Sequence, residues 1–290
     1  MTVVKAKAEY HSMKSQRRIG HALAYIALCI LAIIFVFPIF WLLSCSLKTY
    51  ESIFMYPPKL IQFPLQFINY PDALTYETFP FLTFILNSIK VTLVSVVGAV
   101  LSSSLVGYSF SRLKWRGRNA TFMLVVLTMI IPAEVVITPL YLLYNKIGWI
   151  DTYLPMIVPY FCGKAFYVFM MRQAMMGIPI EMDESARMDG CTSLQTWWII
   201  IMPQAKLALI AVGIMALQDQ WNNYLEPLIY INSQMKQTIS VGLTYFSGSY
   251  QTQWHLVYAA AVLVVMPILI LFAFMQKYFI QGVVVSGVKG

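Results

Sequence analysis

Long stretches without charged residues are the feature that most limits how this chain can fold. No Asp, Glu, Lys or Arg occurs between Arg18 and Lys48, and most of this gap is filled by the run HALAYIALCILAIIFVFPIFWLL. A helix needs about 20 mainly apolar residues to cross a bilayer. Because the run is too long for a secretory signal and no small-residue cleavage site follows it, we interpret it as a retained membrane helix.

The composition extends this interpretation to the whole chain. Of its 290 residues, 59% are hydrophobic and 11% are charged, whereas soluble domains average about 45–50% apolar and about 25% charged residues. Disordered, fibrous and ordinary soluble proteins are therefore excluded, and an all-α integral membrane protein is predicted. Six transmembrane helices are expected, at about 23–43, 91–111, 121–144, 152–171, 207–225 and 256–275. We expect Pro132 and Pro139 to break the third helix.

Lys and Arg residues are distributed unequally between the connecting segments. With the N-terminus placed inside, the inside segments hold fourteen of them and the outside segments hold five. Because positive residues concentrate on the cytoplasmic side, we predict that both termini are cytoplasmic. The chain then divides into a cytoplasmic segment 1–20, a transmembrane domain 21–276 and a cytoplasmic tail 277–290. The same distribution explains the net charge of +8 without a nucleic-acid partner.

Motifs for metal binding, disulfide bonds and nucleotide hydrolysis are missing from the sequence. The cysteines are far apart and form no C-x-x-C pair, and the three histidines lack metal-ligand spacing, so no metal site or disulfide framework is predicted. No G-x-x-x-x-G-K-S/T motif occurs, so the chain is not itself a P-loop ATPase.

The inside loop between the fourth and fifth predicted spans, residues 178–203, is the most informative segment. Pro179 precedes a first helical turn rich in acidic residues, which suit the positive end of the helix dipole. These residues are Glu181, Asp183 and Glu184. Gly190 is placed to end this helix, and Thr192 with Gln195 forms a T-x-x-Q capping box for a second one. By charge alone the first helix is either a solvated surface helix or a docking helix for a soluble partner.

This loop resembles the EAA loop of importer-type ABC-transporter permeases, whose pattern is E-A-A-x-x-D-G with an aromatic residue and a proline further on. The matching residues are Glu184, Ser185, Ala186, Asp189 and Gly190, followed by Trp197 or Trp198 and Pro203. Ser185 departs from the pattern, which has alanine there. The ending S-G-V-K-G resembles the tail of maltose-permease-like subunits. The resemblance runs from about residue 20 to 290, and its tail favours carbohydrate uptake.

The resemblance implies the type I ABC importer permease fold, with 21–276 as the permease domain and a coupling helix that sits in a cleft of a separate ATPase. It implies that Glu184, Ser185, Ala186, Asp189 and Gly190 couple the chain to that ATPase. The implied assembly lies in the bacterial cytoplasmic (inner) membrane, surrounded by lipid. It contains a second permease subunit, two ATP-binding subunits that use ATP and Mg, and an extracytoplasmic sugar-binding protein. This chain itself would be no enzyme and would bind no cofactor.

Three ionisable residues fall within the predicted spans: Glu134, Lys164 and Asp219. Such groups usually face protein or water, so each belongs either to an internal ion pair that fixes packing or to a transport path. Lys164 could pair with either acid. A further set of polar residues at i, i+3, i+4 and i+7 predicts one stripe near the outer end of the fifth span. Its members are Asp219, Asn222, Asn223 and Glu226, flanked by Trp221 and Tyr224. The stripe is either a wall of the sugar path or a helix end that emerges into water.

Other functions remain open at this stage. An ion-coupled secondary transporter would use Glu134, Asp219 and Lys164 as a relay, but the EAA-like loop argues against it. An ABC permease for a peptide or an amino acid keeps that loop and is disfavoured only by the tail and the overall pattern. An intramembrane enzyme is disfavoured because no paired Asp, H-E-x-x-H or G-x-S-x-G motif lies in a span.

Overall fold

The computed structural model describes residues 2–246 and 252–287, and these residues form helices and loops without a strand. The helical elements, in chain order, are α1 (Thr2–Ser46), α2 (Tyr50–Ile53), α3 (Asn69–Leu74), α4 (Phe81–Arg112), α5 (Arg118–Leu127), η1 (Thr128–Ile130), α6 (Ala133–Lys146), α7 (Leu154–Phe161), α8 (Ala165–Met176), α9 (Glu181–Met188), α10 (Ser193–Gln195), η2 (Thr196–Ile201), α11 (Met202–Gln204), α12 (Lys206–Trp221), α13 (Leu225–Tyr230), η3 (Gln234–Lys236), α14 (Ile239–Gly242), η4 (Leu243–Phe246) and α15 (Trp254–Gly287).

Helix α4 is the centre of the molecule, because α7, α8 and α12 all pack along it. Small residues on α4 allow these helices to approach closely, as is usual between membrane helices. A Cβ atom added at Gly107 would lie 2.8 Å from the Cβ of Met171 and 3.0 Å from the backbone N of Arg172. The backbones of α4 and α8 therefore nearly touch at this level. Tyr108, Met171 and Val212 belong to the buried apolar cluster that joins α4, α8 and α12.

Four helices are long and apolar enough to cross a membrane, and the number rises to six when each of two bent helix pairs counts as one span. The first pair joins Arg118–Ile130 to Ala133–Lys146 at 100°. The expected break at Pro132 is therefore confirmed, whereas Pro139 lies inside α6 without ending it. The second pair joins Ser193–Gln204 to α12 at 84°, a bend that the sequence analysis missed.

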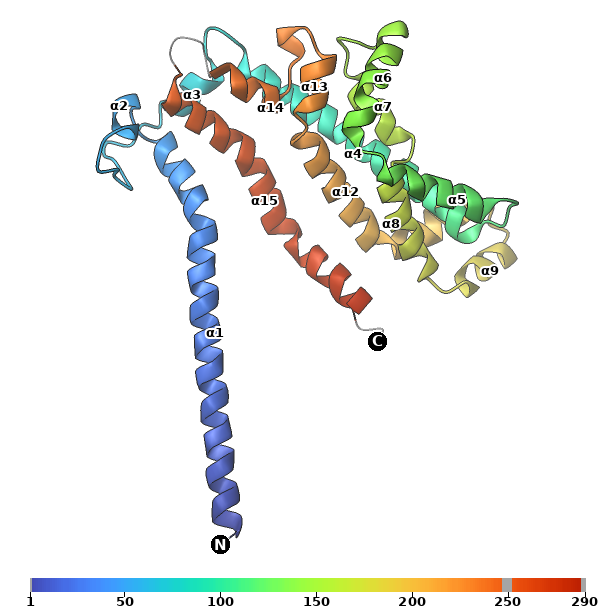
Figure 1. The fold of residues 1–290 in the computed structure, drawn as a ribbon. Helices are drawn as coiled ribbons and strands as arrows, with labels where there is room; N and C mark the ends of the chain where they lie inside the picture. Colours follow the sequence, from blue (N-terminus) through green and yellow to red (C-terminus); the bar gives the residue numbers. More distant parts are fainter. Residues whose placement is uncertain (1, 247–251, 288–290) are drawn as a thin grey trace.

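Helix α1 lies at the edge of the molecule and extends away from the other helices (Figure 1). Its most apolar window within Gly20–Ser46 is 0% buried. Its last turn is buried at Ser44, Cys45 and Ser46, and it contacts α15. Over residues 20–38 α1 thus offers an apolar surface that nothing in the described chain covers.

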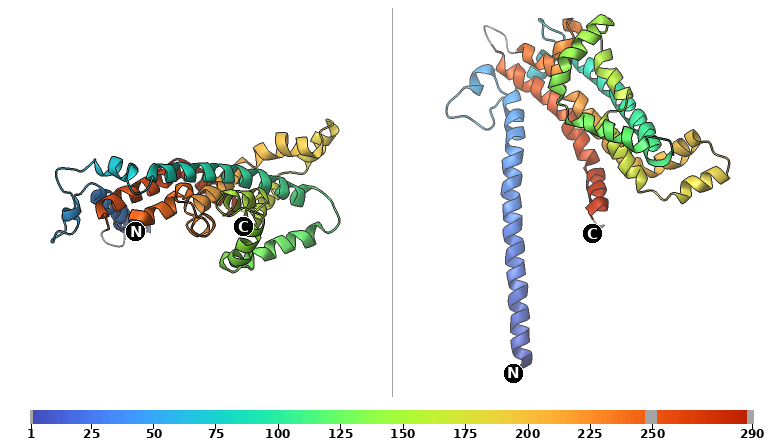
Figure 2. Two further views of the ribbon diagram at one scale, coloured as in Figure 1. Left: turned by 90° about the horizontal axis from the view of Figure 1, so that it is seen from above. Right: turned by 45° about the vertical axis from the view of Figure 1, so that its right-hand side comes forward.

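Helix α9 lies toward the same end of the molecule as the start of α1 and the end of α15. In both side views the beginning of α1, the end of α15 and helix α9 lie toward the same end of the molecule, opposite α3, α13 and α14 (Figures 1 and 2). The loop that resembles the EAA loop is therefore at the end of the molecule from which α1 starts and at which α15 ends.

Candidate functional site

The helix predicted before Gly190 is present as α9, with the acidic first turn and the end at Gly190 that the sequence predicted. The N–H of Cys191 donates to the carbonyl of Ala186 at 2.9 Å, and the N–H of Gly190 donates to that of Arg187 at 3.0 Å. These two bonds form a Schellman motif, which needs a left-handed residue after the helix. Gly190 supplies it with φ +81°. The Thr192–Gln195 capping box that opens α10 is confirmed as well.

Helix α9 has two different faces. Four of the five residues matched to the EAA pattern are exposed: Glu184, Ser185, Asp189 and Gly190. The fifth, Ala186, is buried together with Asp183. The segment beyond the turn continues the exposed surface with Leu194 and Trp198. The polar residues of α9 are exposed, and its opposite face packs against the rest of the protein. Such a helix is suited to bind a soluble partner.

A buried ion pair anchors the inner face of α9, and the sequence analysis did not predict it. The guanidinium of Arg112, at the end of α4, lies 3.3 Å from Oδ2 of Asp183, and the side chains are 4% and 3% exposed. Arg112 Nη2 also donates to the carbonyls of Met175 and Ile178, each at 2.5 Å. The only sequence signal was the presence of a cation at the end of a span and an acid in the first turn of α9.

The chain between α9 and α12 is irregular. Residues Thr196–Ile201 form a π-helix, a rare form that often occurs at functional sites. Trp197 is buried in the cluster around α8, whereas Trp198 is exposed. The 84° bend at Ala205 then leads into α12.

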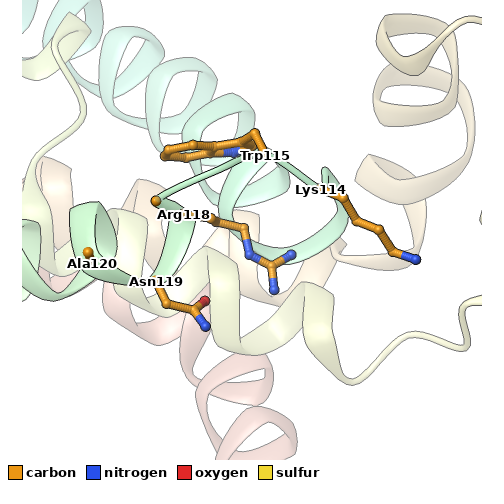
Figure 3. A pocket seen from close by; sticks show the side chains of 6 residues that line it. Lys114, Trp115, Arg118, Asn119 and Ala120 are labelled. Carbon is orange, nitrogen blue, oxygen red and sulfur yellow. The ribbon is translucent and has the colours of Figure 1, made fainter.

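Two hollows flank the connection between α4 and α5. A cleft of about 490 Å³ lies between this connection and α9, with Arg112 and Asp183 in its lining. A hollow of about 310 Å³ lies at the start of α5, where Figure 3 shows Lys114, Trp115 and Arg118 grouped in its lining. The surface beside the exposed face of α9 is therefore basic and aromatic.

A second polar centre joins α7, α8 and α12 inside the helical layer. Oδ2 of Asp219 accepts from Lys164 Nζ at 2.9 Å, from the Tyr160 hydroxyl at 2.9 Å and from the Tyr167 hydroxyl at 3.4 Å. Lys164 also lies 3.8 Å from the centroid of the Tyr160 ring. Of the two acids open to Lys164, the structure selects Asp219. The side chains of Lys164 and Asp219 are 33% and 52% exposed, so the pair is accessible.

The predicted polar stripe does not lie on one helix, and this expectation was wrong. Helix α12 ends at Trp221, and α13 begins only at Leu225. Asn223 instead bridges the gap, because its amide donates to Glu226 at 2.6 Å and accepts from the Glu226 backbone at 3.2 Å. The polar residues are therefore spread over a helix end, a turn and a second short helix.

The flanking aromatic residues of this region differ in their surroundings. Trp221 is buried and donates to the carbonyl of Val264 on α15 at 3.0 Å, so it packs two helices together rather than lining an open path. Tyr224 and Asn222 are exposed. Glu134 is also exposed, at the start of α6, and it has no ion pair with any residue that the structure describes.

At the opposite end of the molecule from α9, an ion pair links two loops, the α6–α7 connection and the segment after α13. Asp151 accepts from Lys236 Nζ at 2.8 Å and from the hydroxyl and backbone of Ser233 at 2.6 and 2.8 Å. These hydrogen bonds, with Lys236 first, hold the pKa of Asp151 well below its usual range. The connection between α6 and α7 is thereby tied to the segment after α13.

Comparison with known proteins agrees with this arrangement. The family described as "Binding-protein-dependent transport system inner membrane component" matches residues 99–285. The chain is 33% identical to the arabinooligosaccharides transport system permease protein AraQ of Bacillus subtilis over 90% of this chain and 92% of the relative. It is 27% identical to the lactose transport system permease protein LacG of Rhizobium radiobacter over 93% of this chain and 97% of the relative.

The fold also resembles a chain from the crystal structure of a bacterial ABC transporter involved in the import of the acidic polysaccharide alginate. The TM-score is 0.81 at 24% sequence identity, and the match covers 90% of this chain and 97% of that chain. The predicted all-α membrane fold of an importer permease is thereby confirmed.

Proposed function

Because this chain belongs to the family of binding-protein-dependent transport system inner membrane components, we propose that it is a permease subunit of an ATP-driven importer for a sugar or an oligosaccharide. The relatives named for arabinooligosaccharide and lactose transport support the carbohydrate class over peptides and amino acids. Membership of this family also disfavours the ion-coupled relay.

The observation that carries the proposal is the two-faced helix α9. Its exposed residues Glu184, Ser185 and Asp189 form the contact with a separate ATPase, and Gly190 turns the chain sharply behind them. Ala186 is buried, so it shapes the contact by allowing α9 to lie close to its support. The partner ATPase uses ATP and Mg, and this chain supplies no part of that chemistry.

The proposed assembly contains this chain, a second permease subunit, two ATP-binding subunits and an extracytoplasmic sugar-binding protein. The bare apolar surface of α1 supports a contact with lipid or the second subunit. Residues 21–276 form the membrane domain, with 1–20 and 277–290 in the cytoplasm of a bacterial cell. The common end of α1, α15 and α9 supports this orientation.

The substrate path of this subunit passes the polar centre at Asp219. Asp219, Asn222 and Tyr224 are exposed there, and Lys164, Asn223 and Glu226 are half-buried. Polar groups beside aromatic rings suit a sugar, because its hydroxyl groups form hydrogen bonds while its apolar face stacks on a ring. Trp221 supports this wall from behind.

Replacement of Gly190 by valine tests the coupling role. A β-branched residue at φ +81° is strained, so the Schellman turn behind α9 should be distorted while the apolar spans still insert. We expect the Gly190→Val permease to reach the membrane but to lose most sugar transport and the stimulation of ATP hydrolysis by the loaded binding protein. Both are measured with the complete transporter in vesicles.

The matched control is Gly148→Val in the connection between α6 and α7. Gly148 has φ +73°, and as at Gly190 no atom lies within 4 Å of the position that a Cβ would take. The backbone strain is thus similar, but α9 is untouched, and transport should stay near the wild-type level. Equal loss in both variants, or wild-type stimulation in Gly190→Val, contradicts the coupling role. Stimulation by a dipeptide but not by oligosaccharides contradicts the carbohydrate class.

A further inference from the structure

We propose that Arg112 is a positioning residue that joins the coupling helix α9 to α4 and α8, so that these three helices move as one body when the ATPase moves α9. The inference rests on the proposed function of α9. It concerns the route by which motion enters the membrane domain, which the resemblance to other permeases does not assign to any residue of this chain.

The guanidinium of Arg112 touches three segments at once. It belongs to the last residue of α4, it lies 3.3 Å from Asp183 in the first turn of α9, and it donates to the carbonyls of Met175 and Ile178 at the end of α8 and just beyond it. A planar guanidinium has donors in several fixed directions, which a lysine ammonium does not reproduce. Arginine is therefore the residue suited to this junction.

The Asp183 carboxylate depends on Arg112. Within residues 2–246 and 252–287, neither carboxylate oxygen accepts a hydrogen bond and Arg112 is its ion-pair partner. A buried charge without its partner is strongly unfavourable. Separation of α9 from α4 would leave the Asp183 carboxylate without its partner. This is unfavourable, so the ion pair favours the state in which α9 and α4 stay in contact.

The junction also lies directly behind the docking face. Asp183 is buried next to the exposed residue Glu184 in the sequence, so a force on one face of α9 reaches the other face within one residue. Close contacts continue the connection between α4 and α8. Gly107 on α4 meets the backbone of α8, and Arg172 Nε donates to the Phe110 carbonyl at 3.4 Å.

The connection from α9 to α12 along the chain is less regular than the contacts between α9, α4 and α8. It passes through the turn at Gly190, the π-helix Thr196–Ile201 and the 84° bend at Ala205. Each of these interrupts a regular helix and adds a place where the backbone can bend. The direct route is therefore α9 to α4 and α8 through Arg112.

Distances between spin labels test this inference with the junction intact. In a background without the native cysteines, one label replaces the exposed Glu181 of α9 and the second replaces either Leu105 on α4 or Ile270 on α15, both exposed. Each labelled transporter must first retain stimulated ATP hydrolysis. Distances are then measured without nucleotide and with a non-hydrolysable ATP analogue plus the loaded binding protein.

We expect the Glu181–Leu105 distance to stay within its nucleotide-free distribution while the Glu181–Ile270 distance shifts beyond its own. Shifts of similar size in both pairs overturn the junction and leave the coupling role of α9 standing. No nucleotide-dependent shift in either pair overturns the proposal that α9 moves with α4 and α8 relative to α15, and the Gly190→Val test then decides the coupling role separately. The two failures are thus distinguishable.

A second test compares Arg112→Gln with Arg116→Gln, which removes an exposed arginine from the neighbouring loop. We expect Arg112→Gln to retain bound ATPase and basal ATP hydrolysis but to transport at least about tenfold less sugar per ATP, and Arg112→Lys to lie between it and the wild type. Arg116→Gln should behave as wild type. Wild-type transport per ATP in Arg112→Gln overturns the proposal. If Arg112→Gln instead lowers the amount of permease in the membrane, and Arg112→Lys restores both this amount and transport to the wild-type level, a positive charge alone is sufficient and the proposal is overturned as well.

Discussion

Two Asp residues, one beside the end of α4 and one on α12, are each paired with a cation, and the two pairs differ strongly in exposure. At the end of α4, Arg112 and Asp183 are 4% and 3% exposed. Between α8 and α12, Lys164 and Asp219 are 33% and 52% exposed. The first pair is enclosed by backbone carbonyls, and the second is surrounded by tyrosine hydroxyl groups that donate to the same oxygen as Lys164.

The comparison shows that the two ion pairs differ in exposure and therefore in what each can do for the fold. A buried pair cannot exchange partners without a large cost, so Arg112–Asp183 holds helices together. An accessible pair is worth little to stability, and its groups are available to a ligand. In the described residues no hydrogen bond reaches Oδ1 of Asp219, so this oxygen is free to accept from a ligand such as the sugar proposed above.

The largest expected effect is that of Asp183→Ala on stability. Removal of one partner of a buried pair costs about 3–5 kcal/mol, because Arg112 keeps its charge in a buried site. Asp219→Ala, at the accessible pair, should cost less, about 1–3 kcal/mol, because it leaves the hydroxyl groups of the buried Tyr160 and Tyr167 without their acceptor. Denaturant unfolding of the purified transporter, followed by tryptophan fluorescence, measures both. If the two variants lose the same free energy of unfolding, the buried pair does not contribute more to stability than the accessible pair.

An intermediate effect is expected for transport. Asp219→Asn keeps the shape of the side chain but removes its charge, so it weakens the acceptor that a sugar would use. Loss of one hydrogen bond of about 0.5–1.5 kcal/mol raises the half-saturating sugar concentration about two- to tenfold. The maximal rate of stimulated ATP hydrolysis should change little. An unchanged half-saturation shows that this pair only packs α12 against α8.

The smallest effect concerns the third pair, Asp151 with Lys236, which lies outside the spans. The pKa of Asp151 is lowered in the folded protein, so its contribution to stability is present above the unfolded pKa of about 4 and is lost as the pH falls below it. We expect Asp151→Asn to cost about 1 kcal/mol or less at pH 7 and the difference from wild type to narrow below about pH 4. If the difference in the free energy of unfolding between Asp151→Asn and wild type does not change with pH, the ion pair is not its cause.

Local sequence signals predicted local structure well. The acidic first turn, Gly190 and the Thr192–Gln195 box all act within a few residues, and the structure contains α9, the Schellman turn and the capping box. The interaction between Arg112 and Asp183 could not be predicted in this way. Its partners are far apart in sequence and meet where α4 packs against α8, an approach that is close at Gly107.

The polar stripe failed for a related physical reason. Its i, i+7 spacing assumed that the helix continues from Asp219 to Glu226, but the chain turns at Asn222 and Asn223. The side chain of Asn223 offers the backbone of Glu226 an alternative to helical hydrogen bonding, which is a common behaviour of asparagine. Periodicity alone does not reveal where such competition ends a helix.

The bare surface of α1 has a consequence for biosynthesis. This helix is made before α4, α8 or α12, and most of its apolar length packs against nothing in the described chain. It therefore has no need to wait for later helices and enters the bilayer on its hydrophobicity alone. The bundle around α4 is different, because its close contacts form only after the last of its members has been translated. The packed end of α1, by contrast, gains its contact with α15 only once α15 has been made.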